Sequence, residues 1–173
     1  MILLPGFAIA RNVFRPRIES LTAVSTEHFR AKPTDIDVFR HVNHARYLRY
    51  MEAARWGLMV RLGLLRHTLR RGWIAPLRSM HVEYYRPLSL GQRFEIRTQY
   101  VRFEERWFYI LHRVFVGEKE VARALAQATV RRGRENIPPS EYLAPLGYEP
   151  ADAPLPPEVE AWVAQHLVAM RSI

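Results

Sequence analysis

Four polar residues that can act on a carbonyl group lie within a short stretch of the chain: Asp37, His41, Asn43 and His44. A carboxylate can activate a water molecule or attack a carbonyl carbon directly. The free N–H groups at the start of a helix can polarise the carbonyl oxygen and stabilise the charge that develops on it. A carboxylate that faces a helix start therefore suits the hydrolysis of an acyl bond.

The same residues are also compatible with purely structural roles. Asp37 and its neighbour Asp35 are typical turn formers, and Asn43 is a typical helix cap. His41 and His44, together with Asp37, have the residue types of a facial metal site. His41 is expected to precede the helix, which separates the two imidazoles, so no metal and no cofactor are expected here. Spacing alone favours the structural roles over catalysis.

A long helix is expected to follow this turn, from near Asn43 to near Gly63. Apolar and small residues surround most of it, which is typical of a helix buried on several sides. Gly63 is a suitable C-cap. The positions that follow alternating steps of three and four residues are Leu48, Met51, Arg55, Leu58 and Leu62.

Around this helix the hydrophobic period is two, which predicts strands. One strand is expected before the turn, at 25–31. After a basic link at 67–72, four more are expected around 80–85, 94–100, 107–116 and 122–130, joined by short turns. Alanines alternate along the last of these, and small side chains suit a sheet that curls around a helix.

The chain divides by composition into three parts. Residues 1–24 are expected to form an N-terminal arm, and residues 25–134 the main domain. Residues 135–173 are expected to form a tail, because seven of the twelve prolines fall between 137 and 157. A short amphipathic helix follows Pro157, with its apolar face formed by Val159, Trp162, Val163, Leu167 and Met170.

Bulk composition restricts the classes of protein. The chain has 173 residues and no cysteine, which excludes disulfides and a cysteine nucleophile. Its net charge of +9 favours a phosphate-rich partner. No nucleic-acid motif accompanies that charge, so a nucleic-acid partner is not expected. Residues 1–10 are apolar but short and interrupted by Pro5-Gly6, so neither a signal peptide nor a membrane span is expected, and the cytoplasm is the expected location.

Two stretches resemble a known family. The first is Asp37-Val38-Phe39-Arg40-His41-Val42-Asn43-His44-Ala45-Arg46-Tyr47, followed by Tyr50-Met51-Glu52-Ala53-Ala54-Arg55. The second is Val82-Glu83-Tyr84-Tyr85-Arg86-Pro87-Leu88 with Gly91. Both resemble the hotdog-fold thioesterase superfamily, in particular its 4-hydroxybenzoyl-CoA thioesterase-like and acyl carrier protein thioesterase-like branches. The likeness covers about residues 27–132.

The resemblance implies an α+β fold, in which a five-stranded antiparallel sheet wraps around one long helix. It implies a homodimer or homotetramer with active sites at the subunit interface. It also implies hydrolysis of an acyl thioester, carried by coenzyme A or by a carrier protein, to a free acid and a thiol. Asp37 would be general base or nucleophile, Asn43 and His44 would hold the thioester, and His41 would orient the turn.

Residues expected to contact the substrate are Tyr47, Ser79 and Arg86, the last as one candidate for the coenzyme A phosphates. Two positions depart from related patterns. Phe39 stands where plant-type enzymes carry asparagine, and Val42 stands where the hydratase branch carries histidine, which argues against hydratase activity. A protein that keeps the fold and binds acyl-CoA without turning it over is the alternative function.

Overall fold

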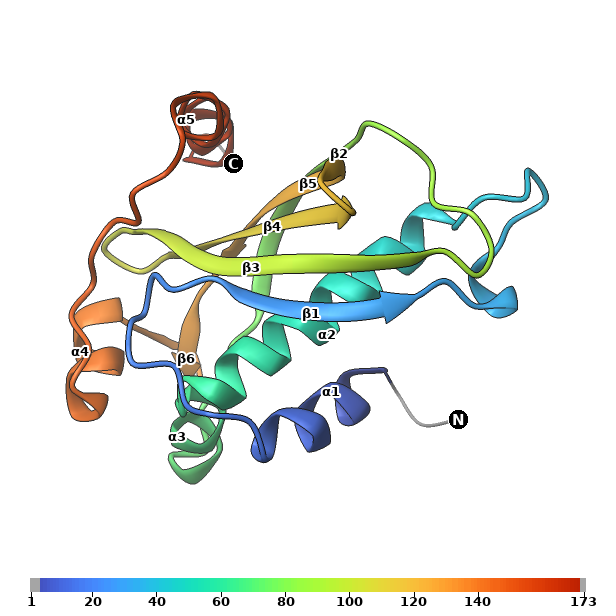
Figure 1. Ribbon diagram of the computed structural model, residues 1–173. Coiled ribbons are helices and arrows are strands. Elements are labelled where there is room, and N and C mark those ends of the chain that lie inside the picture. Colours follow the sequence, from blue (N-terminus) through green and yellow to red (C-terminus); the bar gives the residue numbers. More distant parts are fainter. Residues whose placement is uncertain (1–3, 172–173) are drawn as a thin grey trace.

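The computed structural model describes residues 4–171 and has the expected α+β architecture (Figure 1). The elements in chain order are α1 (Leu4–Val13), β1 (Ser25–Arg30), the 3-10 helix η1 (Pro33–Asp35), α2 (His44–Arg61), α3 (Leu64–Arg70), β2 (Leu77–Tyr84), β3 (Arg93–Phe103), β4 (Phe108–Val116), β5 (Lys119–Ala128), β6 (Val130–Arg132), β7 (Glu135–Ile137), α4 (Pro139–Leu143), the 3-10 helix η2 (Ala144–Leu146) and α5 (Pro157–Arg171).

Five strands form one antiparallel sheet in the order β1-β3-β4-β5-β2. The strands that were expected to be consecutive hairpins, β3–β4 and β4–β5, are paired in register, with Ile96 opposite Val114 and Ile110 opposite Ala126. β2 and β1 are left at the two edges of the sheet. The predicted five-stranded antiparallel sheet is therefore confirmed.

Helix α2 lies along the inner face of this sheet. Met51, Ala54 and Leu58 are fully buried on the side that faces the strands. Burying a side chain such as Met51 or Leu58 contributes roughly 1.5–3 kcal/mol. The predicted alanine stripe of β5 lies opposite, and these small side chains let the helix approach the curved sheet; its members are Ala122, Ala124, Ala126 and Ala128.

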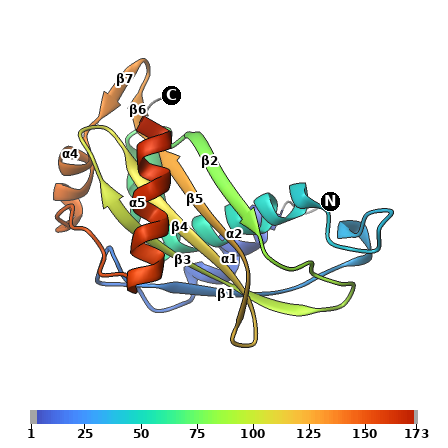
Figure 2. The same cartoon turned by 90° about the horizontal axis from the view of Figure 1, so that it is seen from above.

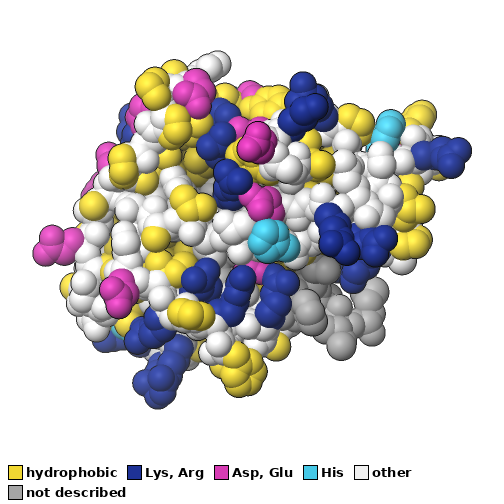
Figure 3. All heavy atoms as spheres, in the orientation of Figure 1, with side chains coloured by type: hydrophobic (Ala, Val, Ile, Leu, Met, Phe, Trp, Pro, Cys, Tyr) yellow, Lys and Arg dark blue, Asp and Glu magenta, His cyan; other side chains and the backbone are white. Residues whose placement is uncertain are grey.

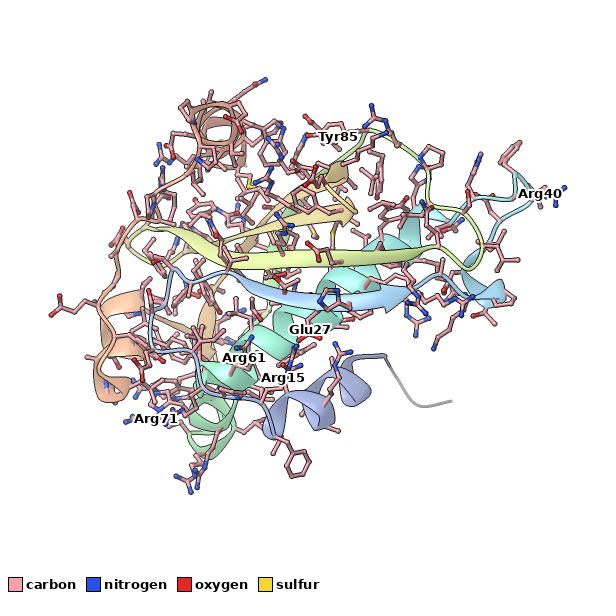
Figure 4. The ribbon with its side chains drawn as sticks, viewed as in Figure 1. Arg15, Glu27, Arg40, Arg61, Arg71 and Tyr85 are labelled. Atoms are coloured by element: carbon pink, nitrogen blue, oxygen red, sulfur yellow. The ribbon has the colours of Figure 1, made fainter. Side chains whose placement is uncertain are left out.

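The segment expected to be an N-terminal arm contains helix α1, which packs against α2. Ala8 and Asn12 are buried at this contact. Gly57 of α2 allows the close approach, because a Cβ there would lie 2.8 Å from Nδ2 of Asn12. The carboxylate of Glu27, on β1, is buried and forms ion pairs with Arg11 and Arg15, which anchors the end of α1 to the sheet (Figure 4).

The basic link expected at 67–72 is largely helical, since α3 continues to Arg70. Gly63 ends α2 in the left-handed conformation, at φ 76°, and α3 starts at the next residue. The hydroxyl of Thr68 lies 2.6 Å from the Tyr142 hydroxyl, so α3 is fixed to α4. The expected boundary at residue 134 falls inside the β6–β7 hairpin.

Helix α5 crosses the outer face of the sheet, on the side opposite α2 (Figure 2). The predicted amphipathic face is the one that docks: Val159, Val163 and Leu167 pack against outward side chains of β3, β4 and β5. Because one central helix cannot cover both faces, an exposed face or edge of the sheet was expected to pair with a second subunit, and this stays a prediction. Helix α5 covers part of the outer face, and β1 and β2 remain the two edges of the sheet.

Candidate active site

The predicted turn is held by backbone hydrogen bonds around Asp37. Its N–H donates to the carbonyl of His41 at 2.9 Å, and its carbonyl accepts from Arg40 at 3.0 Å. Arg40 closes the turn in the left-handed conformation, at φ 64°, and lies at its outer tip (Figure 4). The backbone of His41, rather than its imidazole, therefore makes the contacts that shape the turn.

The carboxylate of Asp37 is used on one side only. Its Oδ1 accepts from the N–H groups of Phe39 and His41 at 2.9 and 3.3 Å. Oδ2 has no hydrogen-bond partner among residues 4–171. One oxygen thus fixes the orientation of the side chain, and the other remains available for a water molecule or a substrate.

Asp35 has a structural role beneath this turn. It is buried, and its Oδ2 accepts from the Tyr50 hydroxyl at 2.5 Å and from the Lys32 N–H at 2.8 Å. Its carbonyl accepts from the Asn43 N–H at 2.8 Å. Burial is the largest cause that raises the pKa of Tyr50, followed by its hydrogen bond to Asp35 and the charge of that carboxylate. The phenol therefore stays protonated and continues to donate its hydrogen bond.

The start of α2 lies directly after the turn. Oδ1 of Asn43 accepts from the Ala45 N–H at 3.0 Å, which makes Asn43 the N-cap of the helix. The N–H of His44 has no carbonyl four residues earlier within the helix. This N–H, with the positive end of the helix dipole, is a suitable donor to a carbonyl oxygen. The amide oxygen of Asn43 is already used by the cap.

A pocket of about 320 Å³ joins these parts. Asp37, His41 and His44 line it from one side, together with Phe39 and Val42. The other side is formed by the end of β2 and the segment after it, through Tyr84, Tyr85, Arg86 and Pro87. Tyr47 lines the base. The structure thus brings together five predicted residues (Asp37, His41, His44, Tyr47 and Arg86), with Asn43 adjacent at the helix cap.

Three tyrosines, Tyr47, Tyr84 and Tyr85, line this pocket with aromatic rings and phenolic hydroxyl groups. The Tyr47 hydroxyl accepts from the Leu88 N–H at 3.0 Å, and its ring packs edge-on against Tyr84. The ring of His44 packs on Tyr84 as well, with ring centroids 4.5 Å apart. Burial raises the pKa of Tyr47 and of Tyr84, and it raises the pKa of Tyr85 to about 12. The phenols are therefore neutral at physiological pH.

Tyr84 and Tyr85 are not among the predicted catalytic or substrate-binding residues, although both belong to the second stretch that resembles the family. Their signal was present, because they end the period-two stretch just before Arg86 and Pro87. Tyr85 projects at the end of β2, as Figure 4 shows. Both side chains are partly exposed, at 38% and 44%, although they are large and aromatic.

Ser79 lies apart from the pocket within one subunit. It sits near the start of β2, and its hydroxyl donates to Oε1 of Gln127 at 3.0 Å. Tyr84 is five residues further along the same strand, a span of about 16 Å. The β6–β7 hairpin carries three further arginines, Arg131, Arg132 and Arg134, of which Arg132 pairs with Glu135.

Basic side chains are spread widely over the surface. Figure 3 shows Lys and Arg side chains across the face that carries β1 and α1, interspersed with apolar and acidic ones. Many of the arginines are paired, as Arg97 with Glu95 and Arg113 with Glu120. Arg86 is exposed beside the pocket and forms no ion pair with a described carboxylate, so it is available to an anionic substrate.

Solved structures share this architecture. The chain superimposes with a TM-score of 0.65 on a DHNA-CoA thioesterase from Staphylococcus aureus, at 14% sequence identity, covering 87% of this chain and 95% of that one. A 1,4-dihydroxy-2-naphthoyl-CoA thioesterase from Synechocystis superimposes with a TM-score of 0.63 at 16% identity, covering 72% and 95%. The fold and the turn-to-helix pocket define a hotdog-fold domain.

The sequence gives the family. The model of the thioesterase-like superfamily matches residues 31–163, so the chain belongs to that superfamily. The protein THEM6 of Danio rerio is 30% identical over 131 residues, which are 73% of this chain and 64% of that protein. The chain therefore spans less than two thirds of the length of this relative. Within residues 4–171, no helix is both long and apolar enough to cross a bilayer.

Proposed function

We propose that this protein hydrolyses an acyl thioester of coenzyme A or of a carrier protein to a free acid and a thiol. The observation that carries the proposal is the side chain of Asp37, whose Oδ1 is fixed by two backbone N–H groups while Oδ2 has no protein partner among the described residues. This carboxylate lines the same pocket as His44, the first residue of α2. Membership of the thioesterase-like superfamily supports the same chemistry.

The reaction uses the two sides of the pocket. The thioester carbonyl oxygen accepts from the N–H of His44, where the helix start stabilises the developing oxyanion. Asp37 removes a proton from a water molecule that attacks the carbonyl carbon, or attacks that carbon itself and forms an anhydride that water then opens. The carbon–sulfur bond breaks and the thiol leaves with a proton. The neutral phenol of Tyr84, which lines the pocket, adds a donor near the carbonyl.

We further propose that the active unit is a homodimer joined through the β2 edges, either alone or within a tetramer. An edge strand with exposed apolar side chains is suited to pair with another strand. Ile74 and Leu77 are 56% and 36% exposed at one end of β2, and Tyr84 and Tyr85 are exposed at the other. Antiparallel pairing about a two-fold axis covers both ends, and it brings Ser79 of one subunit toward the Asp37 pocket of its partner.

The oligomeric proposal is tested by light scattering on the purified chain. The expected mass is twice the 20.3 kDa of one chain, or a multiple of that dimer. Leu77→Asp places a charge at the proposed interface and is expected to give a folded monomer with little activity. Leu69→Asp is the matched control, because Leu69 is 67% exposed on α3, away from β2. A monomeric wild type, or the same loss of assembly in both variants, contradicts the proposal.

The catalytic proposal is tested by thiol release from short, long and aromatic acyl-CoA esters and from acyl carrier protein esters. Asp37→Asn keeps the size of the side chain and removes its charge. General acid–base groups contribute about 10²–10⁴-fold to the rate, and a loss of that size in kcat is expected. Asp152→Asn is the matched control, because Asp152 is exposed and pairs with Arg102 far from the turn.

The alternative function, binding without turnover, predicts a different result from the same panel. Acyl-CoA esters would then bind tightly to the wild type, with no thiol released from any ester. Near-normal turnover by Asp37→Asn would instead remove Asp37 from the mechanism. Cytoplasmic location remains part of the proposal, and the absence of a nucleic-acid partner remains a prediction.

A further inference from the structure

A second cluster of polar side chains lies on the outer face of the sheet, away from the Asp37 pocket. His81 and Glu83 are two residues apart on β2, so they project from the same face. Helix α5 crosses this face of the sheet (Figure 2), and Nε2 of its residue His166 lies 3.6 Å from Oε1 of Glu83. One potential ligand atom from each of His81, Glu83 and His166 lies within 4.8 Å of the other two.

The imidazole of His166 is oriented for coordination. The side chain is buried, with 7% of its surface exposed. Its Nδ1 lies 2.7 Å from the carbonyl oxygen of Trp162, one helical turn earlier, so the proton resides on Nδ1. The lone pair of Nε2 then faces Glu83, whose Oε1 is 3.6 Å away. A backbone acceptor on the far nitrogen is the usual second contact of a metal-binding histidine.

Glu83 divides its two oxygens between different neighbours. Oε2 accepts from the Tyr85 hydroxyl at 2.9 Å. Oε1 faces both histidines, at 3.5 Å from Nε2 of His81 and 3.6 Å from Nε2 of His166. Oε1 is therefore the oxygen that faces the space between the two imidazoles.

His81 completes the cluster from the strand. Its Nε2 is shielded from solvent and makes no hydrogen bond with the described residues. A buried polar atom without a partner costs about 1–3 kcal/mol. The rings of His81 and His166 are centred 3.8 Å apart. Nε2 of each ring lies within 3.6 Å of the same oxygen, Oε1 of Glu83. A cation placed among the three atoms would satisfy all of them.

We propose that His81, Glu83 and His166 bind a divalent transition-metal ion, with zinc as the best fit. Zinc bonds to imidazole nitrogen and carboxylate oxygen at about 2.0–2.2 Å, so tetrahedral ligand atoms lie about 3.3–3.5 Å apart. The separations of 3.5 and 3.6 Å from Oε1 to the two nitrogens are close to that spacing. Two imidazoles and one carboxylate provide three protein ligands and leave one position for water.

Metal binding at this cluster would connect α5 to β2. The helix follows the proline-rich tail and holds the sheet through apolar contacts such as Val163 and Leu167 and through an ion pair between Glu160 and Arg102. A bound ion would add a specific link at the edge strand, so metal and helix docking would stabilise each other. This role is separate from thioester hydrolysis, because the cluster lies on the face of the sheet opposite α2.

The test is zinc binding to the full chain, with any affinity tag removed, after treatment with chelator. Equilibrium dialysis and metal analysis are expected to give one zinc per chain, with a rise in Tm that saturates with zinc and is absent with magnesium. Loss of a metal's supporting contacts commonly costs 10–100-fold in affinity. His166→Gln and Glu83→Gln, which remove ligands themselves, are each expected to weaken zinc binding by at least about 100-fold.

His28→Gln is the matched control, because the side chain of His28 is 69% exposed on β1 and far from α5. It is expected to bind zinc like the wild type. Circular dichroism and Tm without metal establish that each variant is folded. If a ligand variant does not fold, X-ray absorption on the zinc-loaded wild type decides, and two imidazoles plus oxygen donors are expected. The proposal is overturned if the wild type binds no zinc, or if the ligand variants and His28→Gln bind it equally.

Discussion

The buried phenol of Tyr50 donates a hydrogen bond to Oδ2 of Asp35, with 2.5 Å between the two oxygen atoms. Tyr50 belongs to α2, and Asp35 ends η1, so this bond ties the turn to the helix that follows it. Two aspartates separated by a single residue therefore have different roles. Asp35 is buried and holds the turn in place, whereas Asp37 keeps one oxygen open to the pocket.

We expect Tyr50→Phe to destabilise the fold and to lower catalysis. Removing the donor leaves the buried Asp35 carboxylate with fewer partners, at a cost of about 1–3 kcal/mol in the free energy of unfolding. Denaturant unfolding measures that cost. We expect kcat/KM for the best acyl-CoA ester to fall about tenfold, because a displaced turn moves Asp37 relative to the helix start.

Tyr148→Phe separates the two effects. The Tyr148 hydroxyl donates to the Ile18 carbonyl at 2.9 Å, so its loss also removes a partly buried phenolic hydrogen bond. Tyr148 lies far from the turn, and this variant should lose stability while keeping kcat/KM. If the two variants have the same kcat/KM, the bond between Tyr50 and Asp35 does not position the turn.

We expect Gly57→Ala to destabilise the protein although alanine is the better helix former. Alanine gains about 1 kcal/mol over glycine inside an exposed helix. At residue 57, however, the added Cβ would lie 2.8 Å from Nδ2 of Asn12 and 3.2 Å from Oε1 of Glu27. Asn12 is buried and bonded to the Ala8 carbonyl, so it cannot move aside freely. Overpacking costs about 1–3 kcal/mol, and a net loss of about 1 kcal/mol is expected.

Gly6→Ala is the matched substitution within α1. Among the described residues, a Cβ at Gly6 would meet no atom outside its own helical segment within 4 Å, so only the gain in helix propensity applies. Thermal unfolding of both variants measures the difference, and Gly6→Ala is expected to raise Tm slightly. Equal shifts in the two variants would show that α1 does not pack closely on α2 in solution.

The hydrophobic periodicity of the sequence predicted α2 and the strands from β2 to β5, because that periodicity determines which side chains each element buries. Period-two alternation located β2 to β5, and the apolar positions from Leu48 to Leu62 located α2. Helix α1 was missed because Pro5 and Gly6 are poor helix formers, and burial against α2 outweighs that preference. Helix α3 was missed because its sequence from His67 onward is polar and basic.

The part of the site formed by residues close in sequence could be predicted. The part that depends on how distant elements pack together could not. Asp37, Asn43 and His44 are neighbours in sequence, so the turn and the helix start could be recognised together. Ser79 lies apart from them within one subunit, because the direction and register of β2 decide its position, and its contact with substrate stays a prediction. His81 and His166 are 85 residues apart, and only the docking of α5 brings them together.

We expect the stability of the protein to fall in mild acid because of His112. Its side chain is fully buried, and Nδ1 lies 3.0 Å from the Thr98 hydroxyl. Burial first, and then the charge of Arg55, lower the pKa of His112 to about 3. An unfolded histidine titrates near 6.5, so below that pH the unfolded chain binds a proton that the native chain does not. Stability therefore decreases from about pH 6.5 down to about pH 3.

The magnitude follows from the same linkage. Each pH unit in this window costs up to about 1.4 kcal/mol, so roughly 2 kcal/mol is lost at pH 5. Urea unfolding at several pH values measures it. His112→Gln retains an acceptor for Thr98 but does not titrate, and it should flatten the curve between pH 6.5 and 5. His28→Gln, at an exposed site, should leave the curve unchanged; an unchanged curve for His112→Gln contradicts the assignment.

We expect Arg86→Ala to weaken binding of coenzyme A esters without slowing the chemical step. Arg86 lines the pocket beside Asp37, and its guanidinium is available to a phosphate of the nucleotide. A hydrogen bond to a charged group contributes about 1.5–3 kcal/mol, so KM should rise about 10–100-fold while kcat changes little. Steady-state kinetics at low and moderate salt measure this change. The wild type should lose affinity with added salt more steeply than the variant.

Two comparisons connect the effect to the phosphates. An acyl-pantetheine ester has the same thioester but lacks the nucleotide, so wild type and Arg86→Ala should turn it over with the same KM. Arg106→Ala removes another exposed arginine, on the β3–β4 turn, and should leave KM for the coenzyme A ester unchanged. If Arg86→Ala raises KM equally for both esters, Arg86 contacts the acyl or pantetheine part of the substrate and does not bind its phosphates.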